Sequence, residues 1–326
     1  VLIKPKRSTI NSRSKVDLNR EIRFKYSTIK WKGVPIIAAN MDTTGTFEVY
    51  NALKEYNMIT ALHKFYSLED YRKMLEKGLD PNYYMVSTGI GQQSFEHLSS
   101  ILSEIPCYWI CIDIANGYIS DLVDFCAKVR ETWPDKIICA GNVVSGDMVQ
   151  DLVLYGKVDV VKIGIGPGSA CTTRLKTGVG MPQLSAVLEC ADAAHGVGGH
   201  IISDGGITCP GDMAKAFGAG ADFVMVGGQF AGHDENPGEM VEENGEKFKL
   251  FYGMSSEHAM NKHYGKMEKY RSSEGRVIKI KYRGPLENTV LDYLGGLRST
   301  CTYINATCIK HIPKCTTFVR VNNQLN

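Results

Sequence analysis

A glycine-rich loop in the middle of the chain carries the side chain best suited to nucleophilic chemistry. Residues 164–174 read GIGPGSACTTR, which places Cys171 among small residues. A thiolate is an efficient nucleophile when nearby positive charge or dipoles lower the pKa of the thiol. Such a loop also exposes successive backbone carbonyls, which could bind a monovalent cation. An inert, buried Cys171 is the alternative interpretation at this point.

The glycines of this loop match the dinucleotide-binding fingerprint only superficially. Pro167 interrupts the run, and no helix follows at the spacing that the fingerprint needs. We therefore reject a Rossmann-type nucleotide site in this loop.

Polar residues and paired glycines follow several short apolar runs. The polar residues are Asn40, Asp42, His63, Lys64, Asp113, Asn116, Asn142 and Asp204. Gly205-Gly206 and Gly227-Gly228 follow the last two runs, where bare backbone amides can approach a phosphate. These glycines could also serve only to make tight turns. Because both pairs lie at the places where this kind of fold binds phosphate, we favour phosphate binding.

The apolar runs themselves are typical of parallel strands buried on both faces. They lie at 35–40, 58–63, 84–89, 109–113, 137–142, 158–164, 200–205 and 221–228. Helical patterns lie between them at 46–56, 67–77, 94–105, 120–133, 145–155 and 182–194. This alternation predicts an α/β fold, a (β/α)8 TIM barrel with its active site at the carboxyl ends of the strands. An open doubly wound sheet is the alternative, but it rarely runs to this many regular units.

Two intervals break the alternation. One is the loop from Gly164 to Met181, and the other is the polar, glycine-rich segment 229–285, which precedes a helical stretch at 286–298. Long insertions of this kind in a compact domain are usually functional lids. We expect a single catalytic domain over residues 1–326, with a lid at 229–285 after the eighth strand.

Composition excludes several classes of protein. The chain has 326 residues, of which 44% are hydrophobic and 22% charged, unlike a disordered, collagenous or coiled-coil chain. Its ten scattered cysteines form no C-x-x-C pair and no zinc-ligand spacing, which indicates a reducing, cytoplasmic setting. No apolar stretch approaches the roughly 18 to 20 residues of a membrane span, and nothing resembles a signal peptide.

The net charge of +2 conceals a basic segment at 1–32, which holds ten Lys and Arg residues against two Asp and Glu. Such a segment could contact nucleic acid, a membrane surface or a phosphorylated small molecule, or it could be only a solvated edge. The rest of the chain is acidic, so we expect neither a nucleic-acid partner nor a membrane partner.

Motifs spread over essentially the whole chain carry a family resemblance. They are PIIAANMDT (35–43), DIANGY (113–118), AGNVV (140–144), GPGSACTTR (166–174), GVGMPQLSAV (178–187), ISDGG (202–206), ADFVMVGG (221–228), FYGMSS (251–256) and LGGLRSTCTY (294–303). Together they resemble the family of IMP dehydrogenases and GMP reductases. The resemblance implies an oxidoreductase of purine nucleotide salvage.

Two features separate the branches of that family. Dehydrogenases usually insert a paired CBS module after the second strand, whereas here the third strand follows His63 after about twenty residues. Dehydrogenases also use a mobile flap with an Arg-Tyr pair that activates water, and we find no such string after Met254. Residues 269–275, KYRSSEG, instead resemble the reductase pattern with its catalytic glutamate, Glu274.

The reductase resemblance implies NADPH-dependent reductive deamination of GMP to IMP and ammonia. Cys171 would attack C2 of the guanine base, and the amine would leave only after protonation, which requires a general acid. A Thr–Glu pair does this in the family, which here implies Thr173 and Glu274. Loss of ammonia would leave a thioimidate on Cys171, which hydride from NADPH would convert to IMP.

The same resemblance implies the remaining site residues. For GMP they are Asp204, Gly205, Gly206, Gly227, Gly228, Gly253, Met254, Ser255, Arg271, Ser272, Ser273 and Gly275. For NADPH they are Lys64, Asp113, Ile114, Ala115, Ile165, Gly166, Met254, Tyr270, Ser299, Thr300, Cys301 and Thr302, with Ser12 and Arg13 from a neighbouring subunit of a homotetramer. A K⁺ ion would lie against the carbonyls of Gly166, Gly168, Cys171 and Arg174.

The chain departs from the family pattern at a few places. Met181 stands where an aromatic residue is common, Phe65 where His is usual, and the turn at 156–159 is one residue longer. Two other functions stay open: a dehydrogenase without its CBS module, and a catalytically inactive barrel that binds a nucleotide or RNA. The intact set of Cys171, Thr173 and Glu274 argues against the inactive barrel.

Overall fold

Eight parallel strands close into a barrel, as the sequence predicts. In barrel order they are β4 (Ile36–Ala38), β5 (Ile59–Leu62), β6 (Tyr84–Thr88), β7 (Trp109–Asp113), β8 (Ile137–Val143), β9 (Val160–Ile163), β10 (His200–Asp204) and β11 (Phe223–Val226), which pairs again with β4. The computed structural model describes residues 1–238, 240–265 and 272–322. All eight apolar runs of the sequence coincide with these strands, so the doubly wound alternative is wrong.

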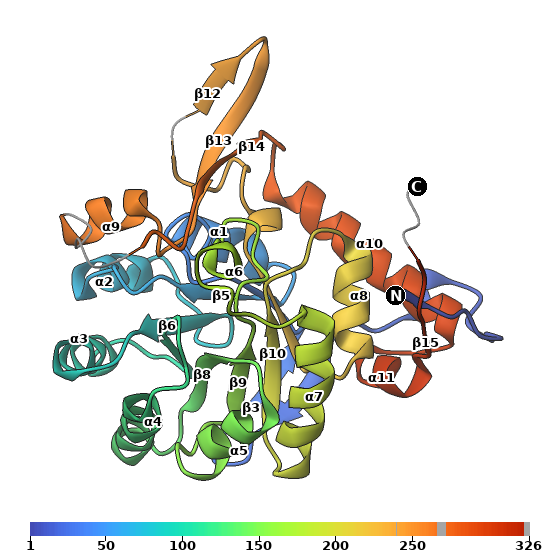
Figure 1. Cartoon of the computed structure of the whole chain (residues 1–326), viewed down its shortest axis with the longest axis horizontal. Coiled ribbons are helices and arrows are strands. Elements are labelled where there is room, and N and C mark those ends of the chain that lie inside the picture. Colours follow the sequence, from blue (N-terminus) through green and yellow to red (C-terminus); the bar gives the residue numbers. More distant parts are fainter. Residues whose placement is uncertain (239, 266–271, 323–326) are drawn as a thin grey trace.

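Helices follow the strands and surround the barrel (Figure 1). They are α1 (Phe47–Lys54), α2 (Leu68–Glu76), α3 (Gln92–Leu102), α4 (Ser120–Thr132), α5 (Gly146–Leu154), α6 (Thr173–Thr177), α7 (Gln183–Gly196), α8 (Pro210–Gly218) and α10 (Leu286–Ile304). Local chemistry starts several of them. Ser67 and Asp70 form a reciprocal capping box on α2, and Pro210 occupies the first turn of α8.

A hairpin from the basic segment closes the amino-terminal end of the barrel. It consists of β2 (Arg20–Arg23) and β3 (Lys30–Gly33), which pair in antiparallel fashion. Trp31 is fully buried and lies edge-on to Trp109, with ring centroids 5.8 Å apart, and 5.3 Å from the ring of Phe223. Residues 20–33 are therefore folded against the barrel and are not a free arm.

A buried carboxylate fastens this hairpin to the barrel floor. Asp222 accepts from Arg20 at 2.7 Å and from His195 at 2.7 Å, and His200 Nδ1 lies 3.2 Å from it. His200 Nε2 faces the carbonyl of Arg23 at 2.9 Å, so this ring must donate there. Burial disfavours the charged imidazolium, but the nearby Asp222 carboxylate outweighs burial and raises the pKa of His200.

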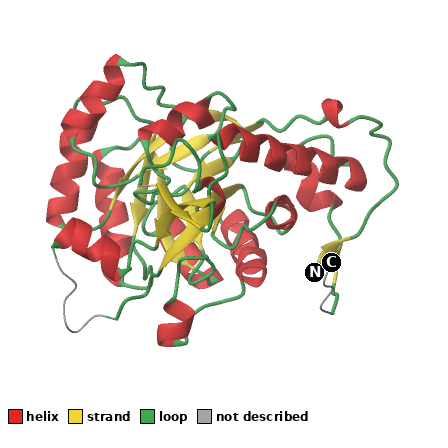
Figure 2. Cartoon of the chain, turned by 90° about the horizontal axis from the view of Figure 1, so that it is seen from above, coloured by secondary structure: helices red, strands yellow, loops and turns green. Residues whose placement is uncertain are grey.

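The first part of the basic segment runs outside the barrel. β1 (Leu2–Ile3) pairs with β15 (Phe318–Val319), and the 3₁₀ turn η1 (Arg13–Lys15) lies against α10. The 3₁₀ turn η3 (Ile309–His311) and α11 (Ile312–Cys315) connect α10 to β15. Figure 2 shows the short β1–β15 strand pair away from the ring of strands.

The segment after β11 forms a small substructure of its own. β12 (Met240–Glu243), β13 (Glu246–Tyr252) and β14 (Val277–Lys281) make an antiparallel sheet that projects beyond the barrel, and α9 (Glu257–Tyr264) lies near α2 (Figure 1). The sequence indicated an insertion here but not its strands. Residues 63–83 alone connect β5 to β6, and they contain α2.

Among the described residues, no helix combines the length and the apolar character that crossing a membrane requires.

Candidate active site

The cysteine loop is clamped to a segment a hundred residues away. Cys171 forms an antiparallel bridge with Gly275, the amide of Thr172 donates to the carbonyl of Glu274 at 2.8 Å, and the amide of Arg276 donates to that of Ala170 at 2.9 Å. This pairing needs glycine at 275, because a Cβ there would lie 2.8 Å from the amide nitrogen of Ser256. The backbone therefore fixes Glu274 beside the loop.

Three side chains form a hydrogen-bonded chain at this junction. The Cys171 thiol donates to Thr173 Oγ1 at 3.3 Å, and the Thr173 hydroxyl donates to Glu274 Oε2 at 2.7 Å. Cys171 is partly exposed, whereas Cys107, Cys111, Cys126, Cys139, Cys190 and Cys301 are buried. A thiol connected through a hydroxyl to a carboxylate can lose its proton to that carboxylate, which can later return it to a leaving group.

Polar residues at the strand ends meet at the centre of the barrel mouth. Lys162, on β9, is 1% exposed, and its ammonium lies 2.5 Å from Asp113 and 3.1 Å from Asp204. Asn142 donates to Asp204 at 2.9 Å, and Asn40 Oδ1 lies 3.4 Å from Lys162 Nζ. Sequence reasoning singled out these residues except Lys162. A single lysine in an otherwise apolar strand, VVKI, was the signal that could have revealed it.

The charges in this cluster stabilise one another. Burial would raise the pKa of the Asp113 carboxyl, but the Lys162 ammonium outweighs burial and lowers it. Burial would lower the pKa of Lys162, but Asp113 and Asp204 raise it well above its ordinary value. The Asp113 carboxylate and the Lys162 ammonium therefore stabilise each other's charged form at the mouth of the barrel.

The two glycine pairs lie side by side because β10 and β11 are neighbours. Gly205 and Gly206 have positive φ angles of 88° and 77°, a backbone conformation of the turn that favours glycine. Without side chains, these two residues also leave their backbone amides open to an anion. Ser169 of the cysteine loop faces Gly228, since a Cβ on that glycine would lie 2.9 Å from Ser169 Oγ. The cysteine loop and the glycine pairs thus border the same space.

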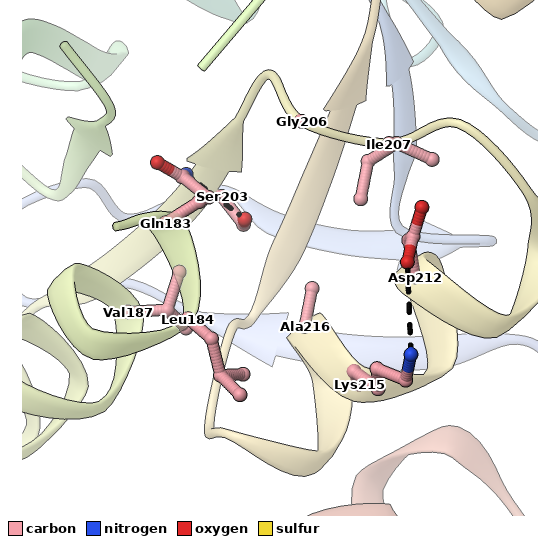
Figure 3. A pocket seen from close by; sticks show the side chains of 9 residues that line it. All are labelled: Gln183, Leu184, Val187, Ser203, Gly206, Ile207, Asp212, Lys215 and Ala216. Atoms are coloured by element: carbon pink, nitrogen blue, oxygen red, sulfur yellow. Dashed lines mark hydrogen bonds and ion pairs between the residues drawn. The ribbon is translucent and has the colours of Figure 1, made fainter. Parts of the chain in front are cut away.

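A small cavity lies beneath Gly206, between α7 and α8 (Figure 3). Gln183 crosses its inner wall and donates to the carbonyl of Ile163 at 2.8 Å and to Ser203 at 3.2 Å. Asp212 and Lys215 pair at 3.8 Å on the α8 side. None of Cys171, Thr173 and Glu274 lines this cavity, so we assign it no part in the reaction. The residues around it support the turn at Gly206.

A second polar network holds α9 over the barrel. Asp42 is 4% exposed, and one of its carboxylate oxygens accepts from Tyr252 at 2.8 Å, Lys262 at 2.8 Å and His263 at 2.6 Å. Burial would raise the pKa of Asp42, but these three donors together lower it. The ring of Phe65 stacks on His263 with centroids 3.6 Å apart. Sequence reasoning did not find this network, because its members are distant in the chain.

His63, which follows β5, lies beside this network as a neutral imidazole. Its burial lowers the pKa to about 4, and its ring stacks on Tyr66.

Comparison with protein families matches residues 1–325 to the IMP dehydrogenase / GMP reductase domain. The chain belongs to the IMP dehydrogenase/GMP reductase family. It is 58% identical over 329 aligned positions to a GMP reductase of Citrobacter koseri and to one of Escherichia coli O157:H7. It is 59% identical to a GMP reductase of Salmonella typhi, and each alignment covers 100% of this chain and 94% of the relative. The resemblance seen in the sequence motifs is therefore confirmed.

Several of the predicted GMP residues lie beside the cysteine loop, where a Cβ on Gly253 would lie 2.9 Å from the carbonyl oxygen of Ala170. Gly253, Met254 and Ser255 follow β13, and the carbonyl of Ser255 accepts from the amide of Glu274 at 3.3 Å. Gly275 packs against Gly253. The predicted substrate residue Arg271 and the predicted cofactor residue Tyr270 lie outside the described residues.

The predicted NADPH residues fall into two groups. Lys64, Asp113, Ile114, Ala115, Ile165 and Gly166 lie at or just after the carboxyl ends of the strands. Ser299, Thr300, Cys301 and Thr302 lie in the last turns of α10, a helix that contacts η1, which holds Arg13 and is capped by Ser12. The Cys301 side chain is buried in the core.

The carbonyl set predicted for K⁺ is compatible with such an ion. Gly168 accepts one backbone hydrogen bond, from Cys171 at 3.0 Å, and Arg174 accepts one from Gly178 at 3.1 Å. Within the described part of the chain, the carbonyls of Gly166 and Cys171 accept none. Carbonyl oxygens have two lone pairs, so backbone hydrogen bonding leaves each of the four with at least one lone pair free.

Proposed function

We propose that this chain is an NADPH-dependent reductase that converts GMP to IMP and ammonia. The hydrogen-bonded chain from Cys171 through Thr173 to Glu274 is the observation that carries the proposal. A nucleotide binder has no need of a partly exposed thiol connected to a carboxylate. The relatives named GMP reductase, at 58% identity over the full chain, support the same conclusion.

In the proposed reaction, one proton is transferred twice along the hydrogen-bonded side chains. The Cys171 thiol gives its proton through Thr173 to Glu274, and its sulfur adds to C2 of the guanine base. Glu274 returns the proton through Thr173 to the 2-amino group, because an unprotonated amine is a poor leaving group. Ammonia departs and the thioimidate on Cys171 remains. When bound, NADPH supplies the hydride that reduces C2 and releases the sulfur.

The binding groups surround this reaction path. The glycine pairs at 205–206 and 227–228 hold the GMP phosphate with their backbone amides. Asp204 binds the ribose hydroxyls, and Gly253, Met254, Ser255, Arg271, Ser272, Ser273 and Gly275 contact the rest of the nucleotide. Lys64, Asp113 and the neighbouring strand-end residues hold the nicotinamide half of NADPH.

The other features form part of the same proposal. Segment 229–285 acts as a lid, which the Asp42 network holds against the barrel through Lys262 and His263. A homotetramer brings Ser12 and Arg13 of one subunit to the adenosine end of the cofactor on the next. K⁺ steadies the cysteine loop, and the protein works in the cytoplasm.

The deciding experiment measures NADPH oxidation and ammonia release with GMP, and NAD⁺ reduction with IMP in parallel. We expect GMP-dependent NADPH loss that Cys171→Ala abolishes. Cys209→Ala, which removes an exposed cysteine, is the matched control and should leave the rate unchanged. NAD⁺ reduction with IMP and no reaction with GMP would make the protein a dehydrogenase.

A further inference from the structure

The lysine at the centre of the barrel has no part in the chemistry proposed so far. Burying an ammonium is costly unless charged and hydrogen-bonding partners compensate it, and an apolar residue would fit the interior strand VVKI at lower cost. Lys162 has such partners from three other strands. They are Asp113 Oδ1 at 2.5 Å, Asp204 Oδ2 at 3.1 Å and Asn40 Oδ1 at 3.4 Å.

We propose that Lys162 is a positioning residue that holds Asp113 and Asp204 in place for the ribose groups of NADPH and GMP. One ammonium thereby serves two nucleotide subsites. The inference rests on the proposed function, because that function assigns Asp204 to GMP and Asp113 to NADPH.

The geometry of Asp204 shows what this positioning achieves. Lys162 and Asn142 both bind Oδ2, and Asn142 is itself fixed by a bond of 2.8 Å to the carbonyl of Gly164. Among the described residues no hydrogen-bond donor reaches Oδ1 of Asp204 within bonding distance. That oxygen is left to accept from a ribose hydroxyl.

The cluster also explains why a positive charge is needed. Two carboxylates that share a site repel each other, and one of them tends to take up a proton. The groups that face them are Lys162, Lys64 and the Cys111 thiol, whose pKa burial raises to about 12. Cys111 therefore stays neutral, while Lys162 compensates both carboxylates and Lys64 adds positive charge near Asp113.

The test measures GMP and NADPH binding separately by calorimetry, with no turnover. Asp204→Asn should weaken GMP binding alone, and Asp113→Asn should weaken NADPH binding alone. Lys162→Met should weaken both by about ten- to a hundredfold, the range for losing a charge-assisted hydrogen bond. Lys162→Arg, which keeps the charge, should recover part of both affinities.

Arg130→Met is the matched control for loss of a buried cation. Its guanidinium lies 2.5 Å from Asp159 Oδ2, just before the amino-terminal end of β9 and away from the strand-end cluster. It should leave both dissociation constants unchanged. Equal weakening in this control would overturn the inference, since the effect would then be general.

A folded Lys162→Met variant that binds both nucleotides as tightly as the wild type would also overturn it. If that variant does not fold, Lys162→Met combined with Asp113→Asn replaces it, because only one carboxylate then remains. The double variant must bind GMP more weakly than Asp113→Asn alone. Wild-type protein that binds neither nucleotide would overturn the proposed function itself, so the two failures are distinguishable.

Discussion

Replacing Glu274 by glutamine tests the proton path most directly. The substitution keeps the size of the side chain and the backbone pairing of residue 274 with Thr172. In the wild type the Thr173 hydroxyl lies 2.7 Å from the Glu274 carboxylate. The amide of the variant can still form a hydrogen bond to this hydroxyl, but it can neither take up nor return a proton. The first proton transfer of the deamination step therefore loses its acceptor, and the second loses its donor.

The expected loss follows from the role of a general acid and base. Such a group contributes about 10²- to 10⁴-fold to a rate, equal to about 3 to 5.5 kcal/mol of activation free energy. We expect kcat of Glu274→Gln to fall by that factor. KM for GMP should change only a few-fold, because among the described residues the carboxylate hydrogen-bonds to Thr173 and to no predicted GMP residue.

The assay follows NADPH oxidation and ammonia release, and it compares NADPH with NADPH deuterated at the transferred position. If protonation of the amine becomes the slow step, the isotope effect on kcat should fall towards unity in the variant. Glu242→Gln, on the exposed strand β12, is the matched control. A variant with wild-type kcat, or one with low kcat and an undiminished isotope effect, would refute the proton path.

Three further outcomes are expected. Gly275→Ala should abolish most activity while the barrel keeps its melting temperature. The new Cβ would lie 2.8 Å from the amide nitrogen of Ser256 and disturb only the backbone pairing that holds the cysteine loop. A variant with wild-type activity would contradict this. The pKa of His200 is higher in the folded protein than in the unfolded chain. Protonated His200 therefore contributes its full stabilisation of the folded state below its unfolded pKa of about 6.5, and this contribution is lost as pH rises through the folded pKa. Melting curves of wild type and His200→Gln should therefore converge towards alkaline pH, and a constant difference would exclude the pairing with Asp222. Trp31→Ala should lower the free energy of unfolding by about 3 to 5 kcal/mol in denaturant titrations, since Trp31 is fully buried at the barrel floor. A loss below about 1 kcal/mol would show that the hairpin does not seal the barrel floor.

The barrel could be predicted because its signal is local and repeated. Each buried parallel strand leaves a short apolar run, and each helix leaves a period of its own, so eight repeats determine the fold class. The hairpin β2–β3 was missed, since its buried residues Ile22 and Trp31 alternate with charged ones and the segment reads as basic. The sheet β12–β13–β14 was missed because β12 and β14 are largely exposed and leave no apolar run.

The proposed catalytic set was predicted unevenly. For Cys171, residue type and the glycine-rich loop indicate a nucleophile, whereas its neighbour Thr173 was singled out by the family resemblance. Glu274 by itself reads as a solvated surface acid, and only the family resemblance singled it out. The structure supplies the reason for its place, because the backbone pairing of Cys171 with Gly275 brings the carboxylate to the hydroxyl of Thr173.

The sequence by itself determined the barrel, the candidate nucleophile and the family, since these depend on short-range patterns and on motifs that stand intact in the chain. Only the tertiary structure decided which distant side chains meet: Lys162 between Asp113 and Asp204, and Asp42 with Tyr252, Lys262 and His263. The physical reason is that closing the barrel brings the ends of all eight strands together. A contact between charges on different strands has no periodicity along the chain, so no local pattern records it.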